Sequence, residues 1–166
     1  MDTIASYRQM GKTELRLELE ELYANYAACL NDERFEDWPD FFIEKCLYKI
    51  VPRENFQRDL PLATMLCESR GYLLDRVQSI RKTHVFAPRV VRRLVSGIRP
   101  IGWQGEELEC RADYAAFETL TDEFTRVFNV GRYLDRIVVD DGRLKFKEKV
   151  CVFDSNLVPN SLIYPL

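Results

Sequence analysis

The sequence has very little histidine: its 166 residues contain one, His84. A Rieske cluster takes two cysteines and two histidines, and a facial-triad iron site takes two histidines and a carboxylate. One histidine cannot complete either site within a single chain. A Ser-His-Asp arrangement is numerically possible, but the chain has no recognisable nucleophile elbow. We interpret His84, in the segment T-H-V-F-A-P after a predicted helix, as a surface or loop residue.

Paired cysteine motifs are also missing. The five cysteines are odd in number and scattered, and no C-x-x-C pair occurs; they are Cys29, Cys46, Cys67, Cys110 and Cys151. This spacing does not resemble a zinc site or a disulfide framework. It predicts reduced thiols in a cytosolic, and therefore cytoplasmic, protein, with no metal or cofactor bound by this chain.

Long apolar runs and charge of one sign are absent as well. No run approaches the roughly 20 residues of a membrane span, and the opening MDTIASYRQMGK lacks the apolar centre of a signal peptide. A net charge of −3 gives no general reason to expect nucleic-acid or membrane binding. Because no repeat or linker divides the sequence, we predict one domain over residues 1–166, long enough to bury a core.

The most informative stretch that is present is LNDERFEDWPDFFIEKCLYKIVPREN, residues 30–55. Phe35, Trp38 and Phe41 or Phe42 recur at three- to four-residue spacing, which predicts the buried side of a short helix. Pro39 should kink or restart that helix, because its nitrogen cannot donate a hydrogen bond. Alternation then begins at Cys46 and predicts a strand.

Other elements follow from periodicity. A first helix is predicted over 14–31 with Thr13 as its N-cap, and a further helix is predicted after Ser69, with an apolar stripe of Leu73, Leu74, Val77 and Ile80. Strands are predicted over 46–53 and 60–68, from 89 to a loop at 97–105, and over 109–118, 124–139 and 144–150.

The last two strands should form a hairpin, because Asp140-Asp141-Gly142 is a strong turn signal. The lysines of the return strand alternate with apolar residues, so we expect them to face water. The last six residues, 161–166, are mostly apolar and should be docked on the protein. The element order predicts an α+β fold with helices on one side of a curved, mostly antiparallel sheet.

These motifs resemble the small (beta) subunits of Rieske-type aromatic-ring-hydroxylating oxygenases. The resemblance covers nearly the whole chain, through the opening stretch and then GYLLDRVQSIRKT, RVVRRLVSG, GRYLDRI and GRLKFKEKVCVFDS. It implies the nuclear-transport-factor-2-like fold: a cone-shaped barrel of a mixed sheet, with three helices from the N-terminal half packed on it. The chain departs from many members of the family at Arg93, where they have histidine.

The resemblance also implies a structural, non-catalytic role beside a larger alpha subunit. That partner would carry the Rieske 2Fe-2S cluster and the mononuclear iron, in an assembly of three alpha and three beta chains. A reductase, sometimes with a ferredoxin, would supply electrons. The short ending and the PREN turn resemble the branch that acts on monocyclic aromatic acids such as salicylate or terephthalate. Arginines on predicted strands are candidates for the subunit interface: Arg92, Arg93, Arg132 and Arg136.

Two other functions remain open. The same fold hosts stand-alone isomerases and dehydratases, which need an acidic base and a phenol or protonated acid. Candidates for such an acid and tyrosine pocket lie on predicted strands: Asp113, Tyr114, Tyr133, Asp135 and Glu148. None of these acids stands alone on an otherwise apolar face, so we favour ordinary buried tyrosines and solvated carboxylates. A non-enzymatic scaffold or transport adaptor is the third possibility.

Overall fold

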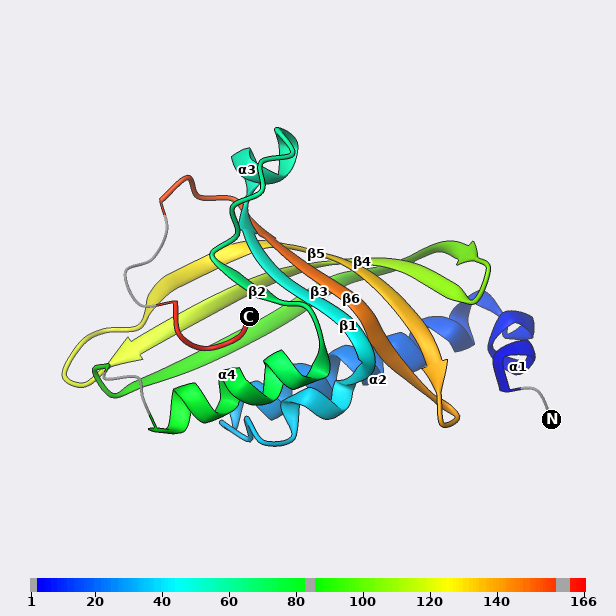
Figure 1. Cartoon of the computed structure of the whole chain (residues 1–166), viewed down its shortest axis with the longest axis horizontal. Coiled ribbons are helices and arrows are strands. Elements are labelled where there is room, and N and C mark those ends of the chain that lie inside the picture. Colours follow the sequence, from blue (N-terminus) through cyan, green and yellow to red (C-terminus); the bar gives the residue numbers. More distant parts are fainter. Residues whose placement is uncertain (1–2, 83–85, 158–161) are drawn as a thin grey trace.

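The computed structural model describes residues 3–82, 86–157 and 162–166, so the predicted loop position of His84 lies outside the described residues. A six-stranded sheet in the order β2-β1-β6-β5-β4-β3 dominates the fold. Helices α2 and α4 lie on one side of the bent sheet, as Figure 1 shows. The strands are β1 (Phe42–Pro52), β2 (Met65–Cys67), β3 (Arg89–Gln104), β4 (Glu107–Leu120), β5 (Arg126–Asp140) and β6 (Arg143–Phe153). The helices are α1 (Thr3–Gln9), α2 (Lys12–Asn31), the 3-10 helix η1 (Trp38–Phe41), α3 (Arg53–Gln57) and α4 (Arg70–Lys82).

This architecture confirms the predicted α+β class. β1 pairs with β6 in parallel and all other neighbours pair antiparallel, so the sheet is mixed as expected. The sheet curves without closing, because β2 and β3 lie at its two edges. The cone is therefore completed by the helices and by the segment 162–166, whose last three residues are buried.

Helix α2 buries the predicted face, including Leu19, Tyr23 and Tyr26, each 0% exposed. Its predicted start was wrong: the helix begins at Lys12, Gly11 occupies the N-cap, and no side chain caps it. Thr13 is the second residue of the helix and cannot be its cap. Propensity signals for caps are weaker than the packing of the apolar face, which sets the extent of this helix.

The aromatic corner is confirmed as core. Phe35 and Trp38 are 0% exposed and Phe42 is 1% exposed, whereas Phe41 is only partly buried. The helical part is one 3-10 turn with Pro39 near its start, where the missing N–H would have had no partner in the helix. β1 follows at once from Phe42, four residues before the predicted start at Cys46.

Two segments and one side chain differ from the prediction. The predicted strand over 60–68 shrinks to β2, and the P-R-E-N turn forms the short helix α3 behind Pro52. Leu74 was expected on the buried stripe of α4, but it is 42% exposed, while Leu73, Val77 and Ile80 are buried. The buried face of α4 therefore includes Leu73 but not the adjacent Leu74.

β3 does not end at the glycine-containing loop as predicted. It continues to Gln104 through two register shifts against β4, one between Ser96 and Arg99 and one between Pro100 and Gly102. Gly97 has φ +60°, which a glycine accepts without strain. Bulges at the edge of a sheet accommodate glycine and proline that would interrupt a central strand.

The β5–β6 hairpin is confirmed at its turn, where Asp141 and Gly142 have φ values of 49° and 76°. The expectation that all lysines of β6 face water was wrong, because Lys149 is 0% exposed. A register shift pairs Ile137 with Phe146 but Arg136 with Glu148. This bulge inserts one residue into β6, so strict alternation fails across it and Lys149 points into the cone.

Candidate functional site: the polar interior of the cone

Polar side chains gather inside the cone among apolar ones. They come from α2, β1, β4, β5 and β6 and are nearly or fully buried: Tyr23, Tyr26, Tyr48, Tyr114, Tyr133, Asp135 and Lys149. α2 covers the sheet and so brings two tyrosines over the strands that supply the others. Buried polar groups concentrated in this way are the default place to look for a catalytic or binding site.

The centre of this cluster is a buried ion pair. Lys149 Nζ donates to Asp135 Oδ2 at 2.9 Å, and Tyr23 Oη donates to the same oxygen at 2.5 Å. Burial raises the pKa of the Asp135 carboxyl, and the charge of Lys149 opposes that rise. Burial also raises the pKa of Tyr23 well above its ordinary value, with the Asp135 charge adding to the rise. Oδ2 of Asp135 is therefore occupied as an acceptor, whereas its buried Oδ1 has no hydrogen-bond partner among the described residues.

Aromatic rings enclose the ammonium group of Lys149. Nζ lies 3.5 Å from the centre of the Tyr133 ring, 4.4 Å from Phe146, 4.7 Å from Tyr26 and 4.8 Å from Tyr23. Cation–π attraction is strongest where water is excluded, which partly offsets the cost of burying the charge. The lysine of this chain fills the place that a cationic ligand would take in an aromatic cage.

Tyr133 and Tyr114 stack with ring centres 4.5 Å apart. Tyr114 Oη donates to Asn129 Oδ1 at 2.6 Å, whereas Tyr133 Oη has no hydrogen-bond partner among the described residues. Burial raises the pKa of Tyr133 well above its ordinary value, so its phenol stays protonated. Tyr133 could donate a hydrogen bond but could not act as a base.

The segment 162–166 of the chain itself fills the space beside these tyrosines. Tyr26 Oη and Tyr48 Oη donate to the main-chain oxygen of Leu166 at 2.7 and 3.1 Å, and Leu166 N donates to Tyr48 Oη at 2.8 Å. Leu166 is 0% exposed and Tyr164 is 7% exposed. The predicted docking is confirmed for 162–166, while Ser161 lies outside the described residues.

The five residues suggested for an isomerase-type pocket do not come together. Tyr114, Tyr133 and Asp135 face the interior, but Asp113 has a 59% exposed side chain and lies near Arg99 on the other face. Glu148 also faces outward and pairs with Arg136. Asp135 is buried with its Oδ2 held by Lys149 and Tyr23, so the three acids do not converge with the phenols on one space. The interior is a closed structural network.

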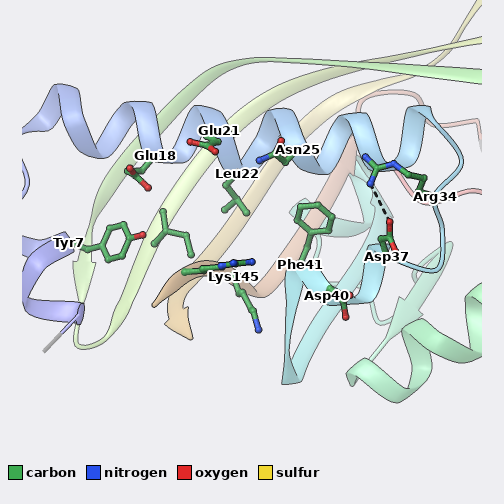
Figure 2. A pocket seen from close by; sticks show the side chains of 12 residues that line it. Tyr7, Glu18, Glu21, Leu22, Asn25, Arg34, Asp37, Asp40, Phe41 and Lys145 are labelled. Carbon is green, nitrogen blue, oxygen red and sulfur yellow. Dashed lines mark hydrogen bonds and ion pairs between the residues drawn. The ribbon is translucent and has the colours of Figure 1, made fainter. Parts of the chain in front are cut away.

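A separate hollow of about 560 Å³ lies on the surface between α2, η1 and the start of β6. Figure 2 shows the side chains that line it. Acidic side chains line it, Glu18 and Glu21 among them, with Lys145 and an Arg34–Asp37 ion pair of 3.2 Å. Mixed exposed charges of this kind are ordinary surface features. The hollow is open and lacks the convergent buried donors of a catalytic site.

The four arginines predicted for a subunit interface have different surroundings. Arg92, Arg132 and Arg136 are exposed, and Arg136 also pairs with Glu107 at 3.1 Å. Arg93 points the other way and is 2% exposed, with Nε and a terminal nitrogen donating to the Pro165 carbonyl at 2.9 and 2.6 Å. The opposite directions of Arg92 and Arg93 agree with strand alternation.

Sequence reasoning missed Lys149 and underrated Asp135. The alternating pattern of β6 predicts that Lys149 faces water. Its side chain faces inward because of the bulge in β6, and no glycine, proline or other residue type in the sequence indicates that bulge. The described residues contain no group of three or more histidine, cysteine, aspartate or glutamate side chains that could hold a metal ion. None of the helices in the described ranges combines the length and apolar character needed to cross a bilayer.

Comparison with known proteins agrees with this geometry. The family model for the ring hydroxylating beta subunit matches residues 25–160. The anthranilate 1,2-dioxygenase small subunit of Burkholderia cepacia is 30% identical over 90% of this chain and 92% of its own length. A terephthalate 1,2-dioxygenase terminal oxygenase beta subunit of Comamonas sp is 26% identical over 86% of this chain and 93% of its own length.

Solved structures point to the same family as the sequence comparisons. The beta subunit of a putative aromatic-ring-hydroxylating dioxygenase from Novosphingobium aromaticivorans superposes with a TM-score of 0.81 and 35% identity. The match covers 90% of this chain and 95% of that one. A putative scytalone dehydratase from the same organism has a TM-score of 0.67 and 20% identity over 89% and 91% of the two chains, a likeness of fold alone. The chain therefore belongs to the ring hydroxylating beta subunit family.

Proposed function

We propose that this chain is the structural small subunit of a multicomponent oxygenase that hydroxylates monocyclic aromatic acids. The family match over residues 25–160 carries the proposal. The interior supports it, because the space that an enzyme of this fold would use for a substrate holds segment 162–166 and a lysine–aspartate pair. We place all of 1–166 in one domain and the protein in the cytoplasm.

The proposal assigns the redox chemistry to a larger alpha subunit. That subunit would hold a Rieske 2Fe-2S cluster and a mononuclear iron, and a reductase, with or without a ferredoxin, would supply the electrons. The single histidine of this chain supports the division, because both iron sites need two histidines. We propose three alpha and three beta chains in the assembly.

The outer face of the sheet is the surface we propose for subunit contacts. Leu94 on β3 and Val130 on β5 are 57% and 42% exposed and flank Ala115 of β4 in the pairing. Arg92 and Arg132 project from the same face, two residues along each strand. Apolar side chains bordered by arginine are typical of a buried interface. Arg136 would contribute at the rim.

Arg93 would act indirectly. Its guanidinium is enclosed and holds Pro165, so its part in assembly would be to position segment 162–166. The substrate class rests on the relatives named for anthranilate and terephthalate, both of which are aromatic carboxylates.

An oxygen-uptake assay tests the proposed function. The chain alone, a large subunit of a ring-hydroxylating oxygenase from the same organism, and the two co-expressed should each be mixed with a reductase and with anthranilate, terephthalate, salicylate or benzoate. We expect substrate-dependent oxygen uptake only from the co-expressed pair. Turnover of any of these acids by the chain alone would overturn the proposal and favour the stand-alone enzyme.

A further inference from the structure

The connection between β1 and β2 is a folded projection with an apolar surface. We call residues 53–62 the arm; it contains α3 and the turn that follows, and in Figure 1 it stands at the top of the view, clear of the sheet. Three apolar side chains of the arm are exposed: Phe56 by 39%, Leu60 by 36% and Leu62 by 74%. Exposed apolar residues are ordinary when they are scattered singly, so three of them on one short projection indicate a contact surface.

Hydrogen bonds within the arm fix its shape before any partner binds. Leu60 N donates to the Asn55 carbonyl at 2.9 Å, and Asn55 Nδ2 donates to the Leu62 carbonyl at 3.1 Å. Arg58 and Glu54 add an ion pair of 2.9 Å across one turn of α3. A surface that is already ordered loses little conformational entropy on binding, so the arm is well suited to enter a hollow on another molecule.

A small apolar hollow lies on the outer face of the sheet, where β3 and β4 pair. Its volume is about 220 Å³, which is room for an apolar side chain. Val90 and Leu94 of β3 are 53% and 57% exposed at this hollow. The hollow is lined by Val90, Arg92, Leu94, Phe117, Thr119 and Thr125.

The arm and the hollow belong to different parts of the sheet. The arm follows β1, whereas the hollow spans β3 and β4, and β6 and β5 separate β1 from β4. Three steps between neighbouring strands of roughly 4.8 Å place β1 about 14 Å from β4. The apolar side chains of the arm therefore stay in water unless another molecule covers them, and the same holds for the hollow.

Charge adds a second match between the two surfaces. Asp59 lies in the exposed turn of the arm beside Leu60, and Arg92 lies at the hollow beside Phe117, with which it pairs across the strands. Within residues 3–82, 86–157 and 162–166, neither Asp59 nor Arg92 makes an ion pair. An apolar projection with a carboxylate complements an apolar hollow with a guanidinium, so a molecule that fits both surfaces is a second copy of this chain.

We propose that the arm of one copy of this chain docks in the outer-face hollow of a second copy. Leu62, the most exposed apolar side chain of the arm, enters the hollow beside Leu94, and Asp59 then lies near Arg92. The contact joins two different surfaces, so it is head-to-tail and can close into a ring. This inference deepens the proposed function by naming the occupant of the outer face; closure after three copies rests on that function, whereas the contact itself concerns this chain alone.

Cysteine cross-linking tests the contact directly. The five native cysteines are buried, so Leu62→Cys and Leu94→Cys each add one exposed thiol. A tagged Leu62→Cys chain is mixed with an untagged Leu94→Cys chain, left to exchange and treated with a short bis-maleimide, and the products are identified by mass spectrometry. We expect the main product to join position 62 of one chain to position 94 of the other. Leu17→Cys, at a 61% exposed position of α2, is the matched control for Leu94→Cys and should give background only.

Sedimentation equilibrium of the isolated chain measures the strength of the contact. Leu62→Asp places a charge in the apolar hollow and should weaken self-association by about tenfold or more, whereas Leu17→Asp should leave its Kd unchanged. Asp59 has φ 50°, which asparagine also accepts, so Asp59→Asn removes only the charge. Asp59→Asn and Arg92→Gln should each weaken association by up to about fivefold. The double variant should lose no more than one of the singles, because each charge acts through the other.

The proposal is overturned if the isolated chain is monomeric at every concentration measured, or if Leu62→Asp associates as tightly as Leu17→Asp. Cross-links that join 62 to 62 or 94 to 94, or a 62-to-94 product at the background level, overturn it as well. Should Leu62→Asp fail to fold, the cross-linking result decides alone. All of these measurements use the chain without a large subunit, so they can fail while the co-expressed pair still takes up oxygen, and the reverse.

Discussion

Lys149 and Asp135 are the residues whose burial most needs a physical explanation. Two charges in a water-free interior are costly, and their attraction repays that cost only when the remaining hydrogen-bonding groups are satisfied. Here Tyr23 adds a bond to Asp135 Oδ2 at 2.5 Å and four aromatic rings surround the ammonium, while Asp135 Oδ1 has no partner among the described residues. The pair therefore specifies how β5, β6 and α2 fit together.

Replacing Lys149 with methionine should destabilise the protein strongly. The variant leaves the Asp135 carboxylate buried without its cation, a change that typically costs about 3–5 kcal/mol of unfolding free energy. Denaturant unfolding at pH 7 measures the loss. The double variant Asp135→Leu, Lys149→Met should recover most of it, because it buries no unpaired charge. Equal losses in the single and double variants would contradict this explanation.

The free energy of unfolding of Lys149→Met should fall as pH rises above the ordinary pKa of aspartate. Burial raises the pKa of Asp135 above its unfolded value, so as pH rises the unfolded chain releases this proton first and folding becomes less favourable. Without Lys149 to oppose that rise, the effect grows. The stability gap between Lys149→Met and the parent protein should therefore narrow as pH falls towards the ordinary pKa of aspartate.

Trp38 should be the most sensitive residue of the aromatic corner. Its ring is 0% exposed and meets Phe42 and Tyr48 edge-on at 5.9 and 5.1 Å. Trp38→Ala should lower the unfolding free energy by about 3–5 kcal/mol, as large truncations in cores do. Trp103→Phe, at a partly buried site, is the matched control and should cost much less. A Trp38→Ala protein that melts within a degree or two of its parent would show that the ring is not core.

At the scale of elements, the hairpin strands β5 and β6 approach unusually closely at Gly131. A Cβ added there would collide with the Val152 carbonyl oxygen and lie 2.7 Å from Phe153 Cα, both backbone atoms that cannot move aside easily. This is a close approach within regular pairing, since the bulge of β4–β5 lies instead at Ala116 and Phe117. Glycine is required at position 131 because the neighbouring backbone leaves no space for a Cβ, and not because the residue has a positive φ.

Gly131→Ala should therefore destabilise the protein by about 1–3 kcal/mol or more, the usual cost of forcing extra atoms into a packed site. Gly102→Ala is the matched control on β3, because a Cβ there meets nothing within 4 Å. Thermal melts of both variants make the comparison. Equal melting temperatures would mean that β5 and β6 have room to separate.

Periodicity predicted most elements, but it failed where a bulge breaks it. The stripes of α2 and the alternation of β4 are continuous, so Tyr23 or Tyr114 could be placed from sequence spacing alone. Lys149 could not, because the inserted residue near Lys147 changes which side of the sheet the following residues face. The docking of 162–166 was predictable from its apolar composition, but its hydrogen bonds to Tyr26, Tyr48 and Arg93 depend on tertiary contacts between distant parts of the chain.

At the scale of the whole molecule, we propose that another chain carries the metal chemistry. We expect the isolated protein to bind no stoichiometric iron or zinc, because its one histidine and dispersed cysteines offer no ligand spacing. Metal analysis of protein purified without a partner checks this. A full equivalent of tightly bound iron per chain would overturn the structural-subunit role.

The most direct test of the central claim is the composition of the native complex. The chain should be co-expressed with a large subunit of a ring-hydroxylating oxygenase from the same organism, purified through a tag on this chain alone, and analysed by gel filtration and native mass spectrometry. We predict one species containing equal numbers of both chains, three of each, because the exposed apolar and arginine side chains on the outer face of the sheet would be buried in an interface. Elution of this chain alone from a lysate that contains the soluble large subunit would contradict the account.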